Sequence, residues 1–188
     1  MTEPVRHTDD NLPSVVDRFD DAFDAWWGRT FRGRPGADRL FYLASELGDF
    51  SVIWLLIAGA QGVTSDEEAD ASIRLALLLL AESALVNQGI KRLFNRPRPA
   101  PVEPRPHHVR KPQTSSFPSG HASSAAAASA LLARRHPRAA PLYRGLAVIV
   151  ATSRIHVQVH HASDVLAGAV VGTVFARVAE RVVPVRSR

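Results

Sequence analysis

The chain has 188 residues, of which 23 are basic and 18 are acidic, and it contains no cysteine. This length is typical of one domain, and the composition excludes collagen-like, coiled-coil and disulfide-rich proteins. Without cysteine there is no disulfide, no thiolate nucleophile and no cysteine-ligated metal centre. Apolar residues make up 46% of the chain, which is enough for a hydrophobic core and argues against wholesale disorder.

The charges are divided unevenly along the chain. Residues 1–83 hold 7 basic and 15 acidic side chains, a net charge of −8, whereas residues 84–188 hold 16 basic and 3 acidic side chains, a net charge of +13. A basic half favours contact with phosphates, nucleic acid or an anionic membrane. Because 21 of the 23 basic residues are arginine, codon usage is an alternative source of the bias. The charge alone therefore identifies no partner.

The first dozen residues are polar and predict a tail, and they lack the pattern of a signal peptide. From residue 12 to residue 27, apolar residues recur with the spacing of one helix face, and aspartates lie largely off that face. Two interpretations of this helix stay open. It lies in a membrane interface with Trp26 and Trp27 at the headgroups, or it packs as an ordinary helix.

Five apolar helical segments are predicted downstream, at about residues 40–60, 72–90, 119–134, 142–158 and 163–183. Gly168 and Gly172 in the last segment have the small-xxx-small spacing of closely packed helices. Charged residues interrupt the segments, and none is a clean apolar run of about 18 residues or more. A membrane bundle with inward polar residues and a soluble all-α bundle are both compatible, and hydropathy favours the membrane bundle.

Residues 97–118 contain 7 of the 13 prolines, so they cannot form a helix interior and predict a long loop. Structureless loops of this length in compact domains are usually functional or disordered. The polar motifs on both sides of the loop favour a functional one.

Pro118-Ser119-Gly120-His121 follows this loop and precedes an alanine-rich helix. Ser119 is a suitable N-cap, and Gly120 permits close backbone approach. A helix start presents unpaired N–H groups to an anion, and His121 would lie in its first turn. A plain capping turn with an incidental histidine is the alternative.

His160 and Asp164 are four residues apart, which predicts that they are neighbours on one helix face. A carboxylate on one imidazole nitrogen makes the other nitrogen a better nucleophile or base. Arg154, six residues earlier, is suited to bidentate phosphate binding. A metal site remains an alternative, because His156, His160 and Asp164 would form one stripe on a continuous helix.

Lys91 and Arg98 stand at the start of the proline-rich loop, where the sequence reads Arg-Pro-Arg-Pro. A basic run is usually a solvated face, a membrane-surface patch or a nucleic-acid patch. The stiffness of this one favours side chains that converge on a single ligand.

Together, the motifs Lys-x6-Arg-Pro, Pro-Ser-Gly-His and Ser-Arg-x5-His-x3-Asp resemble the three-part signature of the type 2 phosphatidic acid phosphatase (PAP2) superfamily. That superfamily also includes bacterial acid phosphatases and vanadium haloperoxidases. The match spans residues 91–164, in the right order and spacing. The matching positions are Lys91, Arg98, Pro99, Pro118, Ser119, Gly120, His121, Ser153, Arg154, His160 and Asp164.

The resemblance implies an all-α, PAP2/haloperoxidase-like helical bundle that crosses the membrane several times. We expect about five spanning helices in a phosphatase domain at residues 40–188, after a tail and amphipathic helix at residues 1–39. Membrane members of the family commonly have six spans, so this chain has a shortened form or uses its first helix differently.

The resemblance also implies hydrolysis of a lipid phosphate or diphosphate through a phosphohistidine, without metal or cofactor. Phosphatidate, phosphatidylglycerol phosphate and polyprenyl phosphates are candidate substrates. His160 would be the nucleophile, Asp164 its partner, and His121 the group that protonates the leaving oxygen. The residues expected to bind the phosphate are Lys91, Arg98, Ser119, Gly120 and Arg154.

A multi-pass topology would place the three motifs on one side of the membrane and the arginine-rich loop 134–144 on the other. The positive-inside tendency makes the arginine-rich side cytoplasmic, so the active site is expected on the extracytoplasmic face. The expected partners are a lipid phosphate and membrane lipids, with no nucleic acid. The alternatives are a soluble acid phosphatase, a vanadate-dependent haloperoxidase and a non-catalytic basic binding protein.

Overall fold

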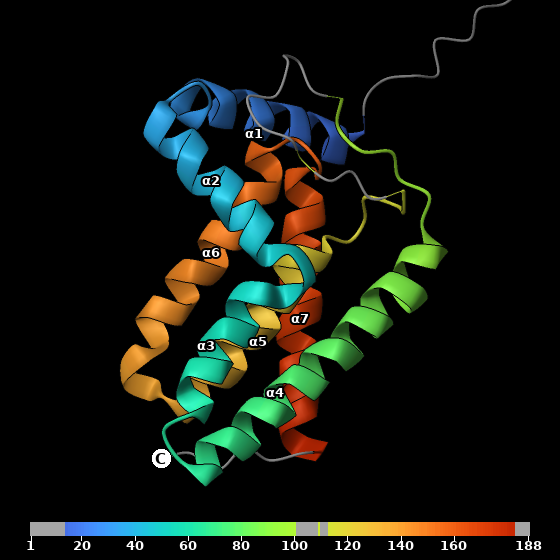
Figure 1. The fold of residues 1–188 in the computed structure, drawn as a ribbon. Helices are drawn as coiled ribbons and strands as arrows, with labels where there is room; N and C mark the ends of the chain where they lie inside the picture. Colours follow the sequence, from blue (N-terminus) through green and yellow to red (C-terminus); the bar gives the residue numbers. More distant parts are fainter. Residues whose placement is uncertain (1–13, 101–108, 110–112, 183–188) are drawn as a thin grey trace, which may run out of the picture.

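The structure, a computed structural model, describes residues 14–100, 109 and 113–182, and within them it consists of helices and loops without a strand (Figure 1). The predicted tail 1–12, part of the proline-rich loop and the C-terminal Arg186 and Arg188 lie outside the described residues. The α-helices are α1 (Val15–Phe31), α2 (Pro35–Gly48), α3 (Val52–Gly62), α4 (Asp66–Ala84), α5 (Gly120–Arg135), α6 (Ala140–His156) and α7 (Ala162–Val182). The short turns are η1 (Asp49–Ser51), η2 (Leu85–Gly89), η3 (Ile90–Leu93) and η4 (Pro137–Ala139).

Helix α5 is the centre of the bundle, and it packs against α6 and α7 (Figure 1). Its alanine and serine side chains are short, so the neighbouring helices approach closely. A Cβ atom at Gly168 would lie 2.3 Å from the carbonyl oxygen of Ser119, and one at Gly172 would lie 1.9 Å from that of Ser123. The predicted close packing at these two glycines is therefore confirmed.

Helix α1 lies across one end of the bundle and contacts α6 and α7 (Figure 1). Ser14 begins it with a capping box, in which its hydroxyl accepts from Asp17 N–H and the Asp17 carboxylate accepts from Ser14 N–H. Trp27 is buried and packs against Phe41 of α2. Trp26 remains exposed, so one tryptophan of the predicted pair packs into the core and the other faces outward.

The predicted segment 40–60 is two helices. Helix α2 ends at Gly48 and α3 begins at Val52, and the chain bends between them at Phe50 and Ser51. These two residues have positive φ angles of 52° and 61°. The bend lies beside the first turn of α5, which it contacts.

Apolar side chains face outward on the long helices, while most of the buried side chains of α5 are alanine and serine. This distribution is typical of helices that face lipid. Two stretches of the described chain, Pro35–Gly62 and Ala162–Val182, are long and apolar enough to cross a membrane by length and composition alone. The expected number of about five spans is not confirmed and stays a prediction. The outward apolar residues include Leu55, Leu56, Ile73, Leu77, Leu80, Leu142, Val148, Leu166, Val170, Val174 and Val178.

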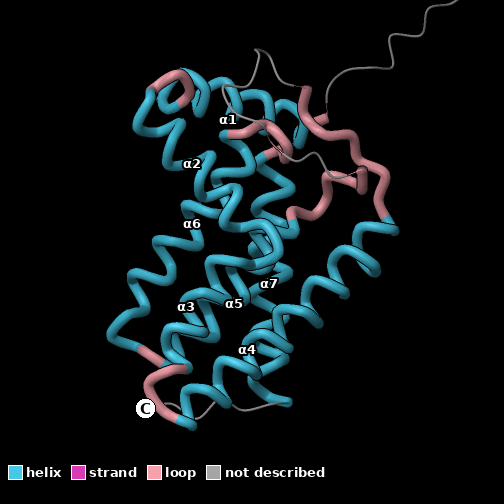
Figure 2. The backbone as a smooth tube through the Cα atoms, viewed as in Figure 1, coloured by secondary structure: helices cyan, strands magenta, loops and turns pink. Residues whose placement is uncertain are grey.

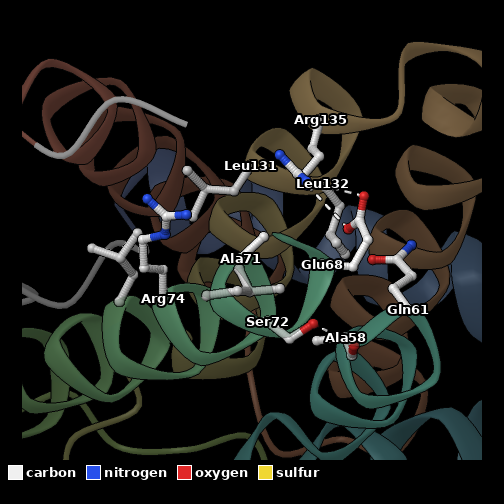
Figure 3. Close-up of a pocket in the computed structure, with 11 residues that line it drawn as sticks. Ala58, Gln61, Glu68, Ala71, Ser72, Arg74, Leu131, Leu132 and Arg135 are labelled. Atoms are coloured by element: carbon white, nitrogen blue, oxygen red, sulfur yellow. Dashed lines mark hydrogen bonds and ion pairs between the residues drawn. The ribbon is translucent and has the colours of Figure 1, made fainter. Parts of the chain in front are cut away.

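Ion pairs join the acidic first half of the chain to the basic second half. The clearest lies between α4 and α5, where Arg135 Nε is 3.0 Å from Glu68 Oε2 and both side chains are buried (Figure 3). Arg135 also reaches Glu67 at 2.9 Å. Arg135 is therefore a buried partner of α4 and does not belong to the exposed arginines expected to mark a cytoplasmic face.

Candidate active site

The described parts of the long loop and the α6–α7 loop lie at the same end of the bundle (Figure 2). Arg98 Nη1 donates to the Val159 carbonyl and Ser119 N–H donates to the Asp164 carbonyl, so the three sequence motifs meet there. They enclose a cavity of about 520 Å³. Five of the eight predicted site residues line it: Lys91, Gly120, His121, Arg154 and His160. The other three, Arg98, Ser119 and Asp164, lie directly behind those residues, as the contacts below show. The structure thus brings the predicted site residues together.

His160 lies in a loop, which corrects the expectation that it shares a helix face with Asp164. Helix α6 ends at His156 and α7 begins at Ala162, and Gln158 between them has a φ angle of 52°. The carbonyl oxygen of Arg154 accepts from the N–H groups of Val159, at 3.1 Å, and of His160, at 3.2 Å. This turn brings His160 back over the end of α6.

Asp164 lies in the first turn of α7, and its carboxylate faces the His160 ring. Its Oδ2 accepts from the backbone N–H of His161 at 2.9 Å, as in half of a capping box. The same oxygen lies 3.5 Å from His160 Nδ1, which is an ion-pair distance and too long for a good hydrogen bond. Catalytic contacts are often long in empty sites and tighten when substrate binds.

Arg98 identifies the protonation state of His160. Its Nη1 lies 3.2 Å from His160 Nε2, and a guanidinium can only donate, so Nε2 accepts. The ring proton of a neutral imidazole is then on Nδ1, facing Asp164. Burial lowers the pKa of His160 well below its usual value, Asp164 opposes this shift, and Arg154, Arg98 and Lys91 add to it. A neutral imidazole with its lone pair on Nε2 is the form that can attack phosphorus.

His121 lines the same cavity as His160 and lies in the first turn of α5. Ser119 caps this helix, accepting from Ala122 N–H at 3.4 Å, so the predicted N-cap is confirmed. The Ser119 N–H donates to the carbonyl oxygen of Asp164 at 3.0 Å. This bond fixes the start of α5, and with it His121, to the first turn of α7.

His156 is not part of the cavity, which corrects the proposed stripe of three metal ligands. The Nε1–H group of Trp27 donates to His156 Nδ1 at 3.2 Å. The other ring nitrogen, Nε2, therefore carries the proton and donates to Asp38 Oδ1 at 2.9 Å. Both nitrogens are thus used between α1, α2 and α6. In the described part of the chain no three His, Asp or Glu side chains are grouped as metal ligands.

Comparison with known proteins agrees with this geometry. The sequence model of the PAP2 superfamily matches residues 72–188. A decaprenylphosphoryl-5-phosphoribose phosphatase of Mycolicibacterium smegmatis is 34% identical over 137 residues, which are 72% of this chain and 73% of that protein. The chain belongs to the PAP2 superfamily. It is a phosphatase of the hydrolase class.

Two solved structures share the fold of this PAP2 phosphatase. One is a transmembrane PAP2-type phosphatidylglycerolphosphate phosphatase from Bacillus subtilis, with a TM-score of 0.68 and 24% identity. The match covers 94% of this chain and 87% of that one. The other is LpxE from Aquifex aeolicus, with a TM-score of 0.65 and 23% identity over 84% of this chain and 93% of that one. The all-helical fold is therefore that of membrane PAP2 enzymes.

Two charged residues that the sequence left without a role contact the candidate catalytic residues of this PAP2 phosphatase. Asp49 Oδ1 lies 3.1 Å from His121 Nε2. Arg96 Nη1 donates to Asp164 Oδ1 at 2.7 Å. Arg96 was visible as part of the stiff Arg-Pro-Arg-Pro run, but no local pattern identifies Asp49.

Proposed function

We propose that this PAP2 phosphatase removes a phosphate from the polar headgroup of a lipid-linked substrate, and that a polyprenyl-linked sugar phosphate is the best candidate class. The single observation that carries the proposal is the polar lining of the cavity. Besides the residues of the three motifs it includes five hydroxyl and amide side chains, which suit a hydroxyl-bearing headgroup next to the phosphate. These residues are Ser83, Asn87, Gln88, Thr114 and Ser115. The activity named for the Mycolicibacterium relative supports this class.

In the proposed reaction, Nε2 of His160 attacks phosphorus and the bond to the leaving oxygen breaks. The His160 ring becomes cationic as the N–P bond forms, and the carboxylate of Asp164 stabilises that charge. His121 donates a proton to the leaving oxygen. A water molecule then attacks phosphorus and the Nε2–P bond breaks, so that His160 becomes neutral again, His121 accepts the proton of the water, and inorganic phosphate leaves.

Three cations would hold the phosphate during both steps. Lys91 and Arg154 line the cavity, and Arg98 reaches the nucleophilic nitrogen. The backbone at Ser119 and Gly120 offers the N–H groups of a helix start. Charge neutralisation of this kind supplies most of the catalysis in phosphoryl transfer.

We further propose that the protein is multi-pass in the cell membrane and that the cavity faces the extracytoplasmic side. The cavity lies at one end of the bundle, and Arg134, Arg138 and Arg144 lie at the other, around the turn between α5 and α6 (Figure 1). The positive-inside tendency makes that other end cytoplasmic. Recovery of the protein in the soluble fraction after extraction without detergent would contradict the membrane location.

The experiment is a substrate panel with purified protein, in which released phosphate is measured. A polyprenyl-linked sugar phosphate is compared with phosphatidate, phosphatidylglycerol phosphate, polyprenyl diphosphate and water-soluble phosphoesters. We expect the highest kcat/KM with the sugar phosphate and activity that persists in EDTA. His160→Ala should abolish release. The matched control is His161→Ala, because the His161 ring contacts the Pro97 carbonyl at 3.3 Å and does not line the cavity.

Hydrolysis confined to water-soluble phosphoesters would favour the acid-phosphatase alternative. Halide oxidation with added vanadate would favour the haloperoxidase. Either result would contradict the proposed function.

A further inference from the structure

Arg96 lies between two buried carboxylates from opposite ends of the chain. Its Nη1 donates to Asp164 Oδ1 at 2.7 Å, and its Nη2 donates to Asp20 Oδ2 at 2.6 Å. Asp164 is fully buried and Asp20 of α1 is 3% exposed. A buried carboxylate is costly unless it is paired and hydrogen-bonded, so one guanidinium makes the burial of both possible.

Asp20 also holds the first turn of α7, which carries Asp164. Its Oδ1 accepts from the backbone N–H of Ser163 at 2.8 Å, and its Oδ2 accepts from the Ser163 hydroxyl at 2.6 Å. The Ser163 hydroxyl is in turn 2.7 Å from Arg96 Nη1. The first N–H groups of a helix have no partner within the helix, and here α1 supplies one.

The arrangement is specific to Asp20 among the aspartates of α1. Asp21, its neighbour, is exposed, and Asp17 lies 3.9 Å from Arg96 with more than half of its side chain exposed. Only Asp20 contacts both Arg96 and the start of α7 in the described structure. Asp21 is therefore a matched control with the same charge on the same helix.

We propose that Asp20 and Arg96 are positioning residues for the nucleophile: they fix Asp164 behind His160 and set how much of its negative charge acts on the imidazole. The proposal deepens the proposed function and rests on His160 as the nucleophile. The charged groups that face His160 are Asp164 from α7, Arg154 from α6, Arg98 from the long loop and Lys91 from η3. Asp20 and Arg96 act on it through Asp164.

The order of charges gives opposite predictions for the two residues. The four side chains contact one another in the order Asp20, Arg96, Asp164 and His160. The positive charge of Arg96 is therefore shared between two carboxylates. When Asp20 is neutralised, Arg96 acts on Asp164 alone, the imidazolium form is less stabilised, and the pKa of His160 falls. When Arg96 is replaced by a neutral side chain, a positive charge beside Asp164 is lost and the pKa of His160 rises.

The test measures kcat and KM against pH for Asp20→Asn, Arg96→Gln and Asp21→Asn. Each kcat/KM is divided by that of the parent protein, so that ionisation of the substrate cancels. We expect kcat to fall about 10–100-fold in the first two variants, with KM within about threefold, because the nucleophile is misplaced. The acid limb should move to lower pH in Asp20→Asn and to higher pH in Arg96→Gln, and Asp21→Asn should match the parent.

Arg96→Lys keeps the positive charge but cannot reach both carboxylates with a planar fork. It should lower kcat and leave the acid limb in place. A merely structural role would lower kcat equally at all pH values, without shifts of opposite sign, and that result would overturn the proposal. Parent-like kinetics in Asp20→Asn would also overturn it. His160→Ala in the same assay separates the two proposals. Full activity of this variant would contradict the proposed function, in which His160 is the nucleophile.

Discussion

Oδ1 of Asp49 lies 3.1 Å from Nε2 of His121, at the bend where α2 gives way to α3. The backbone carbonyl of Ser45 lies 3.2 Å from the same nitrogen. Both oxygens can accept from an N–H group at Nε2, so together they fix the orientation of the His121 ring. His121 is therefore paired with Asp49, as His160 is paired with Asp164.

Asp49→Asn should impair protonation of the leaving oxygen. We expect kcat to fall about 100-fold for an alkyl phosphate, within the usual contribution of general acid catalysis. An aryl phosphate such as p-nitrophenyl phosphate should be affected much less, because its leaving oxygen needs no proton. Steady-state kinetics with both substrates check this. Equal losses on both would contradict an acid role for His121.

Gly48→Ala should disturb the same histidine by steric contact. A Cβ atom there would lie 2.6 Å from Cδ2 of His121 and 2.9 Å from Cγ1 of Val150. Because misplacement of a catalytic group by about 1 Å can cost on the order of 100-fold, we expect kcat to fall at least about tenfold. Gly59→Ala, where a Cβ meets nothing within 4 Å, is the control. Parent-like turnover in Gly48→Ala would show that His121 tolerates displacement.

Gly172→Ala should destabilise the bundle itself. The added methyl would clash with backbone atoms of Ser123, which cannot move without shifting α5. Overpacking of this kind costs about 1–3 kcal/mol, and the Tm in detergent should fall. Gly145→Ala on α6, where a Cβ meets nothing within 4 Å, should leave the Tm unchanged or raise it. Equal Tm values for the two variants would contradict the close contact of α5 and α7.

Arg135→Gln should also lower the Tm, because it leaves the Glu68 carboxylate buried without its partner. Removing one member of a buried ion pair typically costs about 3–5 kcal/mol. Arg138→Gln is the control, since Arg138 is exposed near the same turn. The double change Glu68→Gln with Arg135→Met should recover much of the loss. If Arg135→Gln has the same Tm as the parent protein, the buried ion pair does not contribute to stability.

The candidate site residues could be grouped from the sequence because they lie in short motifs of fixed spacing. The Ser119 cap and the helix start at His121 follow from local patterns, whereas the convergence of the three motifs was implied by the family resemblance. The position of His160 could not be predicted in this way. The chain leaves α6 through a positive φ angle at Gln158, which is not a glycine, so no residue type indicated the break.

The supporting residues were missed because their partners are far away in the sequence. Asp20 lies 76 residues from Arg96 and 143 from Ser163, and no periodicity links positions so distant. The bend at Phe50 and Ser51 likewise has its positive φ angles at residues other than glycine, and Gly48 at the end of α2 is the only local signal for it. The same long-range pairs account for part of the acidic first half, because Asp20, Glu67 and Glu68 are partners of arginines in the basic half.

The stereochemical course at phosphorus tests the central claim, reaction through a phosphohistidine on His160, most directly. The substrate carries a phosphoryl group made chiral with three oxygen isotopes, an alcohol is supplied as the acceptor in place of water, and the configuration of the phosphate ester that forms is determined. Each in-line displacement inverts phosphorus, so attack by His160 followed by attack of the acceptor predicts net retention. Net inversion would show direct attack on the substrate and would contradict the account.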